Sequence, residues 1–279
     1  MLPFAAIFEV IMLSIFAIYI AVGAIAGLVA GLFGVGGGVI IVPALIYAFA
    51  LQGMPEQVLT HMAVGTSLAI ICVSSVSSVR THHKNAAVIW PIFKVMAPGL
   101  MLGVITGVYT VIQIKGLHLQ LIMGCFLSLV AIQMGFNIMP KGERQLPGAV
   151  AVSLFSFVSG WVSALFGIGG GSLNVPFLSY FSTPMKKAVA TAAACGMPIA
   201  LAGAMTNTFA GWANPIMPTL SVGYIYLPAF LGVAVMAAPF AKLGANLAKK
   251  LPASVLKRIF AAFLVIIGQS MILKALGIF

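Results

Sequence analysis

The 279-residue sequence contains no aspartate, and glutamate occurs only three times. Charged residues make up 6% of the chain, whereas a soluble domain of this size carries about a quarter. The low charge excludes a soluble globular protein. The absence of aspartate excludes a Ser/His/Asp catalytic triad, and no Cys/His cluster has the spacing of a metal site. We therefore expect a protein that is not an enzyme and that has no cofactor and no bound metal.

Cysteine is also scarce, and Cys72, Cys125 and Cys195 each lie within an apolar run. A cysteine in such a run usually behaves as a small buried hydrophobic residue. Three dispersed residues of this kind do not form the framework of a disulfide-rich secreted domain. We expect all three to be buried and unpaired.

Apolar residues, by contrast, are abundant. The chain is 62% hydrophobic and its mean hydropathy is +1.18, which predicts an integral membrane protein whose main partner is the lipid bilayer. The net charge of +11 does not indicate a nucleic-acid partner, because most Lys and Arg residues stand between apolar runs, where they orient membrane proteins. The first apolar run is too long for a signal peptide and lacks a basic start, so we expect it to remain as a membrane helix.

One stretch of the sequence occurs twice. Gly31–Leu45 reads GLFGVGGGVIIVPAL and Ala164–Leu178 reads ALFGIGGGSLNVPFL, with nine identical positions in an ungapped comparison. The copies fall at corresponding points of the two halves of the chain. We therefore expect a single transmembrane transporter domain over 1–279, with one repeat at about 1–139 and a second at about 147–279.

The apolar runs predict an all-α fold of about ten transmembrane segments, two of which are short helices broken by glycine. The expected helices are Val10–Ala30, Val35–Leu51, Leu59–Val79, Val88–Thr110, Leu119–Met139, Pro147–Phe166, Ile168–Ser182, Ala188–Gly211, Tyr224–Leu243 and Val255–Leu276. Five segments per half is an odd number, so the second half would enter the membrane in the opposite sense. This is the inverted-repeat plan of many secondary transporters.

The second and seventh segments could cross the membrane or turn back within it, and the basic residues help to decide. If all ten segments cross, twelve of the 14 Lys and Arg residues lie on one face, and only Lys115 and Lys274 lie on the other. If both short segments turn back, the division is eight against six. Basic residues concentrate on the cytoplasmic side of membrane proteins. The distribution therefore favours ten crossings with both termini outside.

The glycine triplets Gly36–Gly38 and Gly169–Gly171 predict breaks in these helices, because glycine is a poor helix former. A helix that restarts after such a break presents free N–H groups and the positive end of its dipole. Together these form an anion site that needs no charged side chain. The alternative is that the glycines only allow close helix packing, as small residues do in membranes.

The two copies differ just after the glycines. The first copy has Val39 and Ile41 where the second has Ser172 and Asn174. These polar side chains can donate hydrogen bonds to a ligand or satisfy the nearby broken backbone.

Three further polar residues, Thr66, Ser67 and Asn207, stand within apolar helices. They either line the transport path or, for the hydroxyls, bond back to their own helix. His61, near the start of a membrane helix, is a candidate proton switch.

The twin G-G-G-x-x-x-V-P segments, the two matched halves and the size of the chain resemble the sulfite exporter TauE/SafE family. The resemblance covers nearly the whole chain. It implies a permease for sulfur-containing anions. It also implies that the glycines of the two triplets are central to the site, namely Gly36, Gly37, Gly38, Gly169, Gly170 and Gly171.

We therefore predict a multi-pass transporter of the inner (plasma) membrane that exports sulfite, a sulfonate or a related organosulfur anion by alternating access. The candidate substrate-binding residues are the six glycines together with Thr66, Ser67, Ser172, Asn174 and Asn207. The alternatives are an anion channel of the same fold and an intramembrane enzyme or redox subunit. A homodimer is one arrangement that the sequence leaves open.

Overall fold

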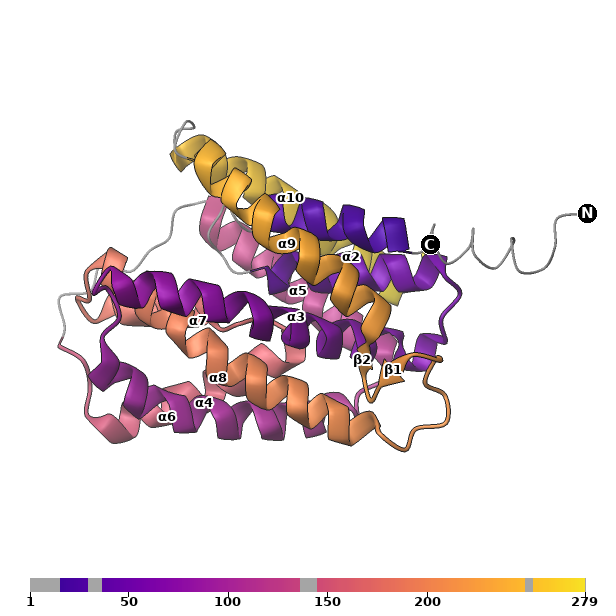
Figure 1. The fold of residues 1–279 in the computed structure, drawn as a ribbon, viewed down its shortest axis with the longest axis horizontal. Coiled ribbons are helices and arrows are strands. Elements are labelled where there is room, and N and C mark those ends of the chain that lie inside the picture. Colours follow the sequence, from indigo (N-terminus) through magenta and orange to yellow (C-terminus); the bar gives the residue numbers. More distant parts are fainter. Residues whose placement is uncertain (1–15, 30–36, 136–144, 249–252, 279) are drawn as a thin grey trace, which may run out of the picture.

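The computed structural model describes residues 16–29, 37–135, 145–248 and 253–278. Helices account for most of these residues (Figure 1). In chain order, the elements are the helix Phe16–Val29, α2 (Gly38–Leu51), α3 (Glu56–Lys84), α4 (Trp90–Val111), α5 (Gly116–Gly135), α6 (Ala149–Phe166), α7 (Gly171–Tyr180), α8 (Met185–Gly211), β1 (Ser221–Val222), β2 (Ile225–Tyr226), α9 (Leu227–Ala248) and α10 (Ala253–Ala275). The helical class expected from the sequence is confirmed.

Among the described residues, a small β-hairpin is the one departure from the all-α prediction. β1 pairs antiparallel with β2, and Ser221 lies opposite Tyr226. Tyr224, which we expected to begin a helix, lies in the turn between the strands, and α9 begins three residues later at Leu227. The turn contains Gly223 at φ +59°, a left-handed backbone that favours glycine. Residues 225–226 pair in the hairpin, and so the helix begins later than expected.

Seven of the described helices are long and apolar enough to cross a membrane, namely α3, α4, α5, α6, α8, α9 and α10. The other described helices are short. α7 has ten residues and is therefore about 15 Å long, whereas the hydrocarbon core of a bilayer is about 30 Å thick. The expected count of ten crossings is not confirmed.

The helices run between two ends of the molecule (Figure 1). The β end holds β1 and β2 together with the loops 52–55 and 112–115. The opposite end holds the loops 85–89 and 181–184. A hydrogen bond from the backbone N–H of Ile89 to Thr191 Oγ1, 3.0 Å long, joins the start of α8 to the loop between α3 and α4 at this opposite end.

Each short helix lies antiparallel to the helix before it. The rings of Phe155 in α6 and Phe177 in α7 stack with centroids 3.6 Å apart. Tyr19, early in its helix, packs against Phe49 near the end of α2, with ring centroids 6.1 Å apart. The two helical hairpins open to different ends, because α7 leads to the start of α8 at the opposite end and α2 leads to the start of α3 at the β end.

Most described basic residues lie at the opposite end, where α3 and α9 end and where α4, α8 and α10 begin. They are Arg80, Lys84, Lys94, Lys186, Lys187, Lys242, Lys257 and Arg258. Lys115 and Lys274 lie at the β end. Lys141, Arg144, Lys249 and Lys250 fall outside the described residues. In each pair of a short helix and the helix before it, the chain enters and leaves at the same end of the molecule. The loops before and after the pair therefore lie on the sides that the ten-crossing prediction gave them, even where the short helix does not cross the membrane.

Small residues allow the long helices to pack closely. Gly99, Gly103 and Gly107 follow one face of α4 and lie against α6. A methyl group at Gly107 would come within 2.8 Å of the Trp161 carbonyl oxygen. Close approach of backbones through such residues is the usual way in which membrane helices associate.

The three cysteines are free, but only one of them is buried as expected. Cys195 is buried in α8, Cys72 is half-buried, and Cys125 is exposed on α5. The expectation of burial was wrong for Cys125, because an apolar run in a membrane protein has one face toward lipid and the other toward the core. An apolar neighbourhood in the sequence therefore does not imply burial inside the protein.

Candidate functional site

The second glycine segment breaks the chain between α6 and α7. α6 ends at Phe166, and Gly167 follows with φ +61°. Gly170, with φ +71°, directly precedes the first residue of α7. Both values lie in the left-handed region, which glycine adopts without the steric cost that a Cβ atom imposes. The segment is therefore unwound in the interior of the protein, as expected from the triplet Gly169–Gly171.

The first glycine segment has a different backbone. Gly36 lies outside the described residues. Gly37 has right-handed helical torsions, φ −57° and ψ −20°, and α2 begins at Gly38. A helix therefore starts where the sequence predicted, but the described part of this segment needs no left-handed glycine.

The two segments meet inside the protein. A methyl group at Gly38 would lie 2.8 Å from the Cα atom of Ile168 and would collide with the carbonyl oxygen of Gly167. On the other side, a methyl group at Gly196 of α8 would lie 3.0 Å from the carbonyl oxygen of Gly169. The start of α2 and the break before α7 therefore touch, and α8 packs against the same break.

Several polar side chains surround the second break. Asn174 and Ser163 are both 0% exposed. The hydroxyl of Ser159 donates a 2.7 Å hydrogen bond to Asn174 Oδ1. Among the described residues, Asn174 Nδ2, Ser163 Oγ and Ser172 Oγ have no hydrogen-bond partner. A methyl group at Gly170 would lie 2.9 Å from Asn174 Nδ2 and 3.5 Å from Ser163 Oγ. Two unpartnered donors thus converge on the N-terminal end of α7.

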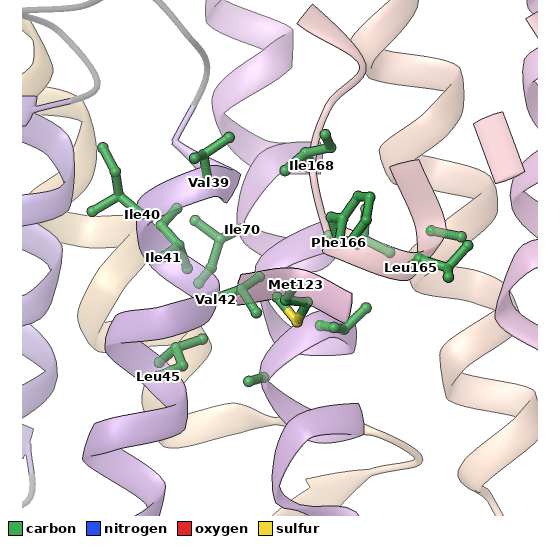
Figure 2. Close-up of a cluster of buried hydrophobic side chains, with 14 of the residues drawn as sticks. Val39, Ile40, Ile41, Val42, Leu45, Ile70, Met123, Leu165, Phe166 and Ile168 are labelled. Atoms are coloured by element: carbon green, nitrogen blue, oxygen red, sulfur yellow. The ribbon is translucent and has the colours of Figure 1, made fainter. Parts of the chain in front are cut away.

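The start of α2 has apolar surroundings instead. Val39, Ile40, Ile41 and Val42 are between 0% and 3% exposed. Figure 2 shows these side chains in one cluster with others from α3, α5, the end of α6 and the break that follows it, including Ile70, Met123, Leu165, Phe166 and Ile168. A helix N-terminus is present in both segments, but among the described residues unpartnered hydrogen-bonding side chains accompany only the second.

Thr66 and Ser67 lie in the middle of α3, and both are fully buried. The Ser67 hydroxyl donates a 2.9 Å hydrogen bond to the carbonyl oxygen of Gly167. Thr66 Oγ1 accepts a 3.0 Å hydrogen bond from the backbone N–H of Tyr226. Neither side chain shows a bond back to its own helix. Ser67 is brought to the second break, whereas Thr66 anchors β2.

Asn207 is not brought to either break. Its Nδ2 donates a 2.8 Å hydrogen bond to the carbonyl oxygen of Gly203, one turn earlier in α8. Its own carbonyl oxygen accepts a 3.1 Å hydrogen bond from the N–H of Tyr224, in the β turn. Asn207 therefore lies near the β end, about 16 Å along the helix from Gly196 at 1.5 Å per residue.

His61 also lies at the β end. Its Nε2 is 3.1 Å from the carbonyl oxygen of Val111 and 3.0 Å from that of Ile114. The side chain therefore joins α3 to the end of α4. The geometry places this imidazole away from the glycine breaks.

Ser159 and Ser163 are the residues of this site that sequence reasoning missed. They stand four residues apart in α6, so they share one face of the helix. The spacing of these serines, in the helix that leads into the second glycine triplet, was their one signal in the sequence, and no motif marks them. Only the fold of the α6–α7 hairpin shows that this face meets Asn174.

Residues 19–271 match the family described as sulfite exporter TauE/SafE. The chain is 38% identical to a probable membrane transporter protein of Haemophilus influenzae over 256 residues, which cover 91% of this chain and 96% of the relative. It is 29% identical to a probable membrane transporter protein of Methanocaldococcus jannaschii, over 91% of this chain and 94% of the relative. It is 27% identical to the probable membrane transporter protein YunE of Bacillus subtilis, over 95% and 99% of the two chains. No solved structure matches the chain.

The family and these relatives are membrane transporters and not enzymes. Their match extends over nearly the whole chain, and the described helices include seven that can span a bilayer. This multi-pass membrane protein therefore belongs to the sulfite exporter TauE/SafE family.

Proposed function

We propose that the protein is a secondary transporter that exports a small oxyanion, namely sulfite, a sulfonate or a related organosulfur anion, across the plasma membrane. The observation that carries this proposal is the second glycine break, where the N-terminus of a helix lies in the interior together with buried hydrogen-bond donors that have no acceptor among the residues that the structure describes. Membership of a sulfite exporter family supports the choice of a sulfur oxyanion.

The proposed site lies where the two breaks meet. The first turn of a helix leaves N–H groups without partners inside the helix. The positive end of the helix dipole also favours a negative charge. Gly37 and Gly38 would contribute the start of α2, and Gly169–Gly171 would contribute the start of α7. Gly36 belongs to the same proposal, although it lies outside the described residues.

The proposed mechanism is alternating access between two inverted repeats, at about 1–139 and 147–279. The support is geometric, since the two helical hairpins open to opposite ends and touch where their glycines lie. Rocking of one half against the other would expose the site first to one side of the membrane and then to the other.

The opposite end, which carries most of the described basic residues, is proposed to face the cytoplasm. The test uses a variant without native cysteines, into which Lys84→Cys or Glu56→Cys is introduced. With a membrane-impermeant maleimide we expect Glu56→Cys to react in intact cells and Lys84→Cys only after permeabilisation. The reverse pattern would contradict this orientation.

The proposed driving force is the membrane potential. An inside-negative potential favours anion exit by about 2.3 kcal/mol per charge per 100 mV, which corresponds to roughly a fifty-fold gradient of a monovalent anion. The chain has no aspartate, and His61, the candidate proton switch, lies at the β end. With the potential clamped at zero, a pH gradient is expected not to drive uphill transport. Uphill movement that disappears in His61→Ala would make this histidine a coupling residue instead.

The experiment that tests the function is flux in proteoliposomes, with sulfite, methanesulfonate and sulfate as probes. We expect saturable uptake of at least one probe, driven by an inside-positive potential and reduced by the other probes. Single-channel currents in a planar bilayer would favour the rival function, an anion channel of the same fold. Correctly inserted protein without flux of any probe would contradict the proposal.

A further inference from the structure

We propose that the anion is held at the second break alone, by Ser163, Asn174 and the N-terminus of α7, and that Ser163 is a substrate-binding residue. This inference rests on the proposed function and narrows its site from two breaks to one. It also adds a residue that no motif in the sequence marks.

Two groups at this break are buried without partners. Ser163 and Asn174 are 0% exposed, and among the described residues their Oγ and Nδ2 atoms have no hydrogen-bond partner. The large majority of buried polar side-chain atoms in proteins do have one, so each exception needs an explanation. Both atoms lie within 3.5 Å of the position that a methyl group on Gly170 would occupy. A hydrogen-bond acceptor bound at the N-terminal end of α7 would pair with both atoms.

The orientation of the Asn174 amide is set by a neighbour. Ser159 Oγ, 2% exposed, donates to Asn174 Oδ1 over 2.7 Å. With Oδ1 engaged, the NH₂ group is turned toward Gly170. Ser159 is therefore a positioning residue, which acts on the ligand only through Asn174.

The groups presented at this place are donors: a hydroxyl, an amide NH₂ and the N–H groups of the first turn of α7. They match a ligand that offers several acceptor oxygens and a negative charge. Apart from these donors, the nearest side-chain atoms are apolar. Ile199 Cδ1 lies 2.5 Å from the position of a methyl group on Gly170, and Ile71 Cγ2 lies 3.3 Å from that on Gly169. The site therefore fits a small oxyanion held by neutral hydrogen-bond donors.

The described part of the first break lacks such donors. Val39 and Ile41, which correspond to Ser172 and Asn174, carry no donors. In addition, the space beside Gly38 is closed by the backbone of Gly167 and Ile168. The start of α2 therefore packs directly against the second break and contributes no donor side chain to the proposed site.

The test compares Ser163→Ala and Asn174→Ala with Ser156→Ala as the matched control. Ser156 is also a fully buried serine of α6, but its hydroxyl donates to the carbonyl oxygen of Val152 in its own helix, over 2.7 Å. The measurements are the KM for sulfite uptake into proteoliposomes, and the rise in the melting temperature of the purified protein when sulfite is added.

We expect the KM to rise about tenfold or more in both site variants, because each loses a hydrogen bond to a charged ligand. The control should remain within about twofold of the wild type. Without sulfite, Ser163→Ala should melt at the same temperature as the wild type or higher, because the hydroxyl that it removes has no partner. A serine with a merely structural role would show a lower melting temperature and an unchanged KM.

The outcomes separate this inference from the proposed function. If the wild type transports sulfite and both site variants have the same KM as the wild type, the proposed binding site is wrong and the proposed function is still supported. If sulfite stabilises the wild type but not the two variants, and the wild type shows no flux, the binding site is supported and the transport function is wrong. Neither flux nor stabilisation with sulfite, methanesulfonate or sulfate would overturn both.

Discussion

The two glycine segments share nine of their 15 aligned residues, and each places the start of a helix in the interior of the protein. Their surroundings differ. The start of α2 is enclosed by apolar side chains, whereas hydrogen-bond donors from α6 and α7 gather at the start of α7. A helix N-terminus is therefore present twice, but a complete set of donors is present once. The comparison teaches that the side chains around a helix start decide whether it can serve as a binding site.

The backbones differ as well. Gly37 is right-handed before α2, whereas Gly170 is left-handed before α7. A left-handed residue reverses the chain sharply and lets α7 fold back along α6. The reversal brings Asn174 opposite Ser159, and so the unusual backbone and the donor cluster have a common origin.

The largest effect is expected from Gly170→Ala. A Cβ atom at this residue meets a left-handed backbone, which costs about 1–2 kcal/mol, and it would lie 2.5 Å from Ile199 Cδ1. We expect the strained backbone to displace the start of α7, and a displacement of about 1 Å at a reacting or binding group can cost roughly a hundredfold in rate. We expect transport per inserted molecule to fall by about that factor, measured as initial uptake into proteoliposomes.

Gly53→Ala is the control for this change. Gly53 is also left-handed, at φ +68°, but a methyl group there would meet nothing within 4 Å. It lies in the loop between α2 and α3. This variant should lose stability and retain transport, and a similar loss of transport in both variants would remove the special role of Gly170.

The next effect is expected from Asn174→Ile, which gives the second segment the residue type found at Ile41 in the first. A hydrogen bond to a charged group contributes about 1.5–3 kcal/mol, so the KM for sulfite should rise between about ten- and a hundredfold. Thr206→Val is the control, because the Thr206 hydroxyl bonds within its own helix to the carbonyl oxygen of Ala202. Equal KM values in the two variants would contradict the comparison.

The reciprocal change, Ile41→Asn, should lower stability more than it alters transport. Ile41 is 3% exposed among apolar neighbours, so a buried amide there would lack partners, at a cost of about 1–3 kcal/mol. The melting temperature of the purified protein measures the effect. A variant with native stability and a lower KM would show that the first break also accepts a ligand.

The smallest effect is expected from Ser67→Ala, which removes the hydrogen bond to the carbonyl oxygen of Gly167. One such bond contributes about 1 kcal/mol, and the second break should become less well ordered. We expect a severalfold fall in the maximal uptake rate. Ser75→Ala on the same helix, whose hydroxyl bonds locally to Cys72, should behave as the wild type. A fall of equal size in both variants would indicate a general effect on α3.

Much of the fold could be predicted from the sequence, because backbone groups in lipid must be paired within helices. The apolar runs therefore placed the helices to within a few residues, and the glycine triplets placed both helix starts. The length of α7 was less predictable. Ile168–Ser182 is apolar throughout most of its length, but the left-handed Gly170 and the turn after Tyr180 reduce the helix to ten residues.

The candidate site was predictable only in part. Asn174 and Ser172 stood out as polar residues within an apolar segment, and Ser67 proved to contact the second break. Asn207, chosen on the same criterion, bonds within α8 near the β end. A polar residue in an apolar run is recognisable in the sequence, but whether it bonds to its own helix depends on side-chain direction and on neighbours from other helices.

The sequence by itself determined that this is a helical membrane protein with two related helix starts, because hydropathy and glycine content act locally along the chain. The sequence also showed that polar residues follow the glycines only in the second copy, but only the tertiary structure decided which other side chains join them. Ser163 and Asn174 come from different helices, and their donors converge on Gly170 because the left-handed glycines fold α7 back against α6. Convergence of this kind depends on the packing of two helices against each other, which no property of either helix alone specifies.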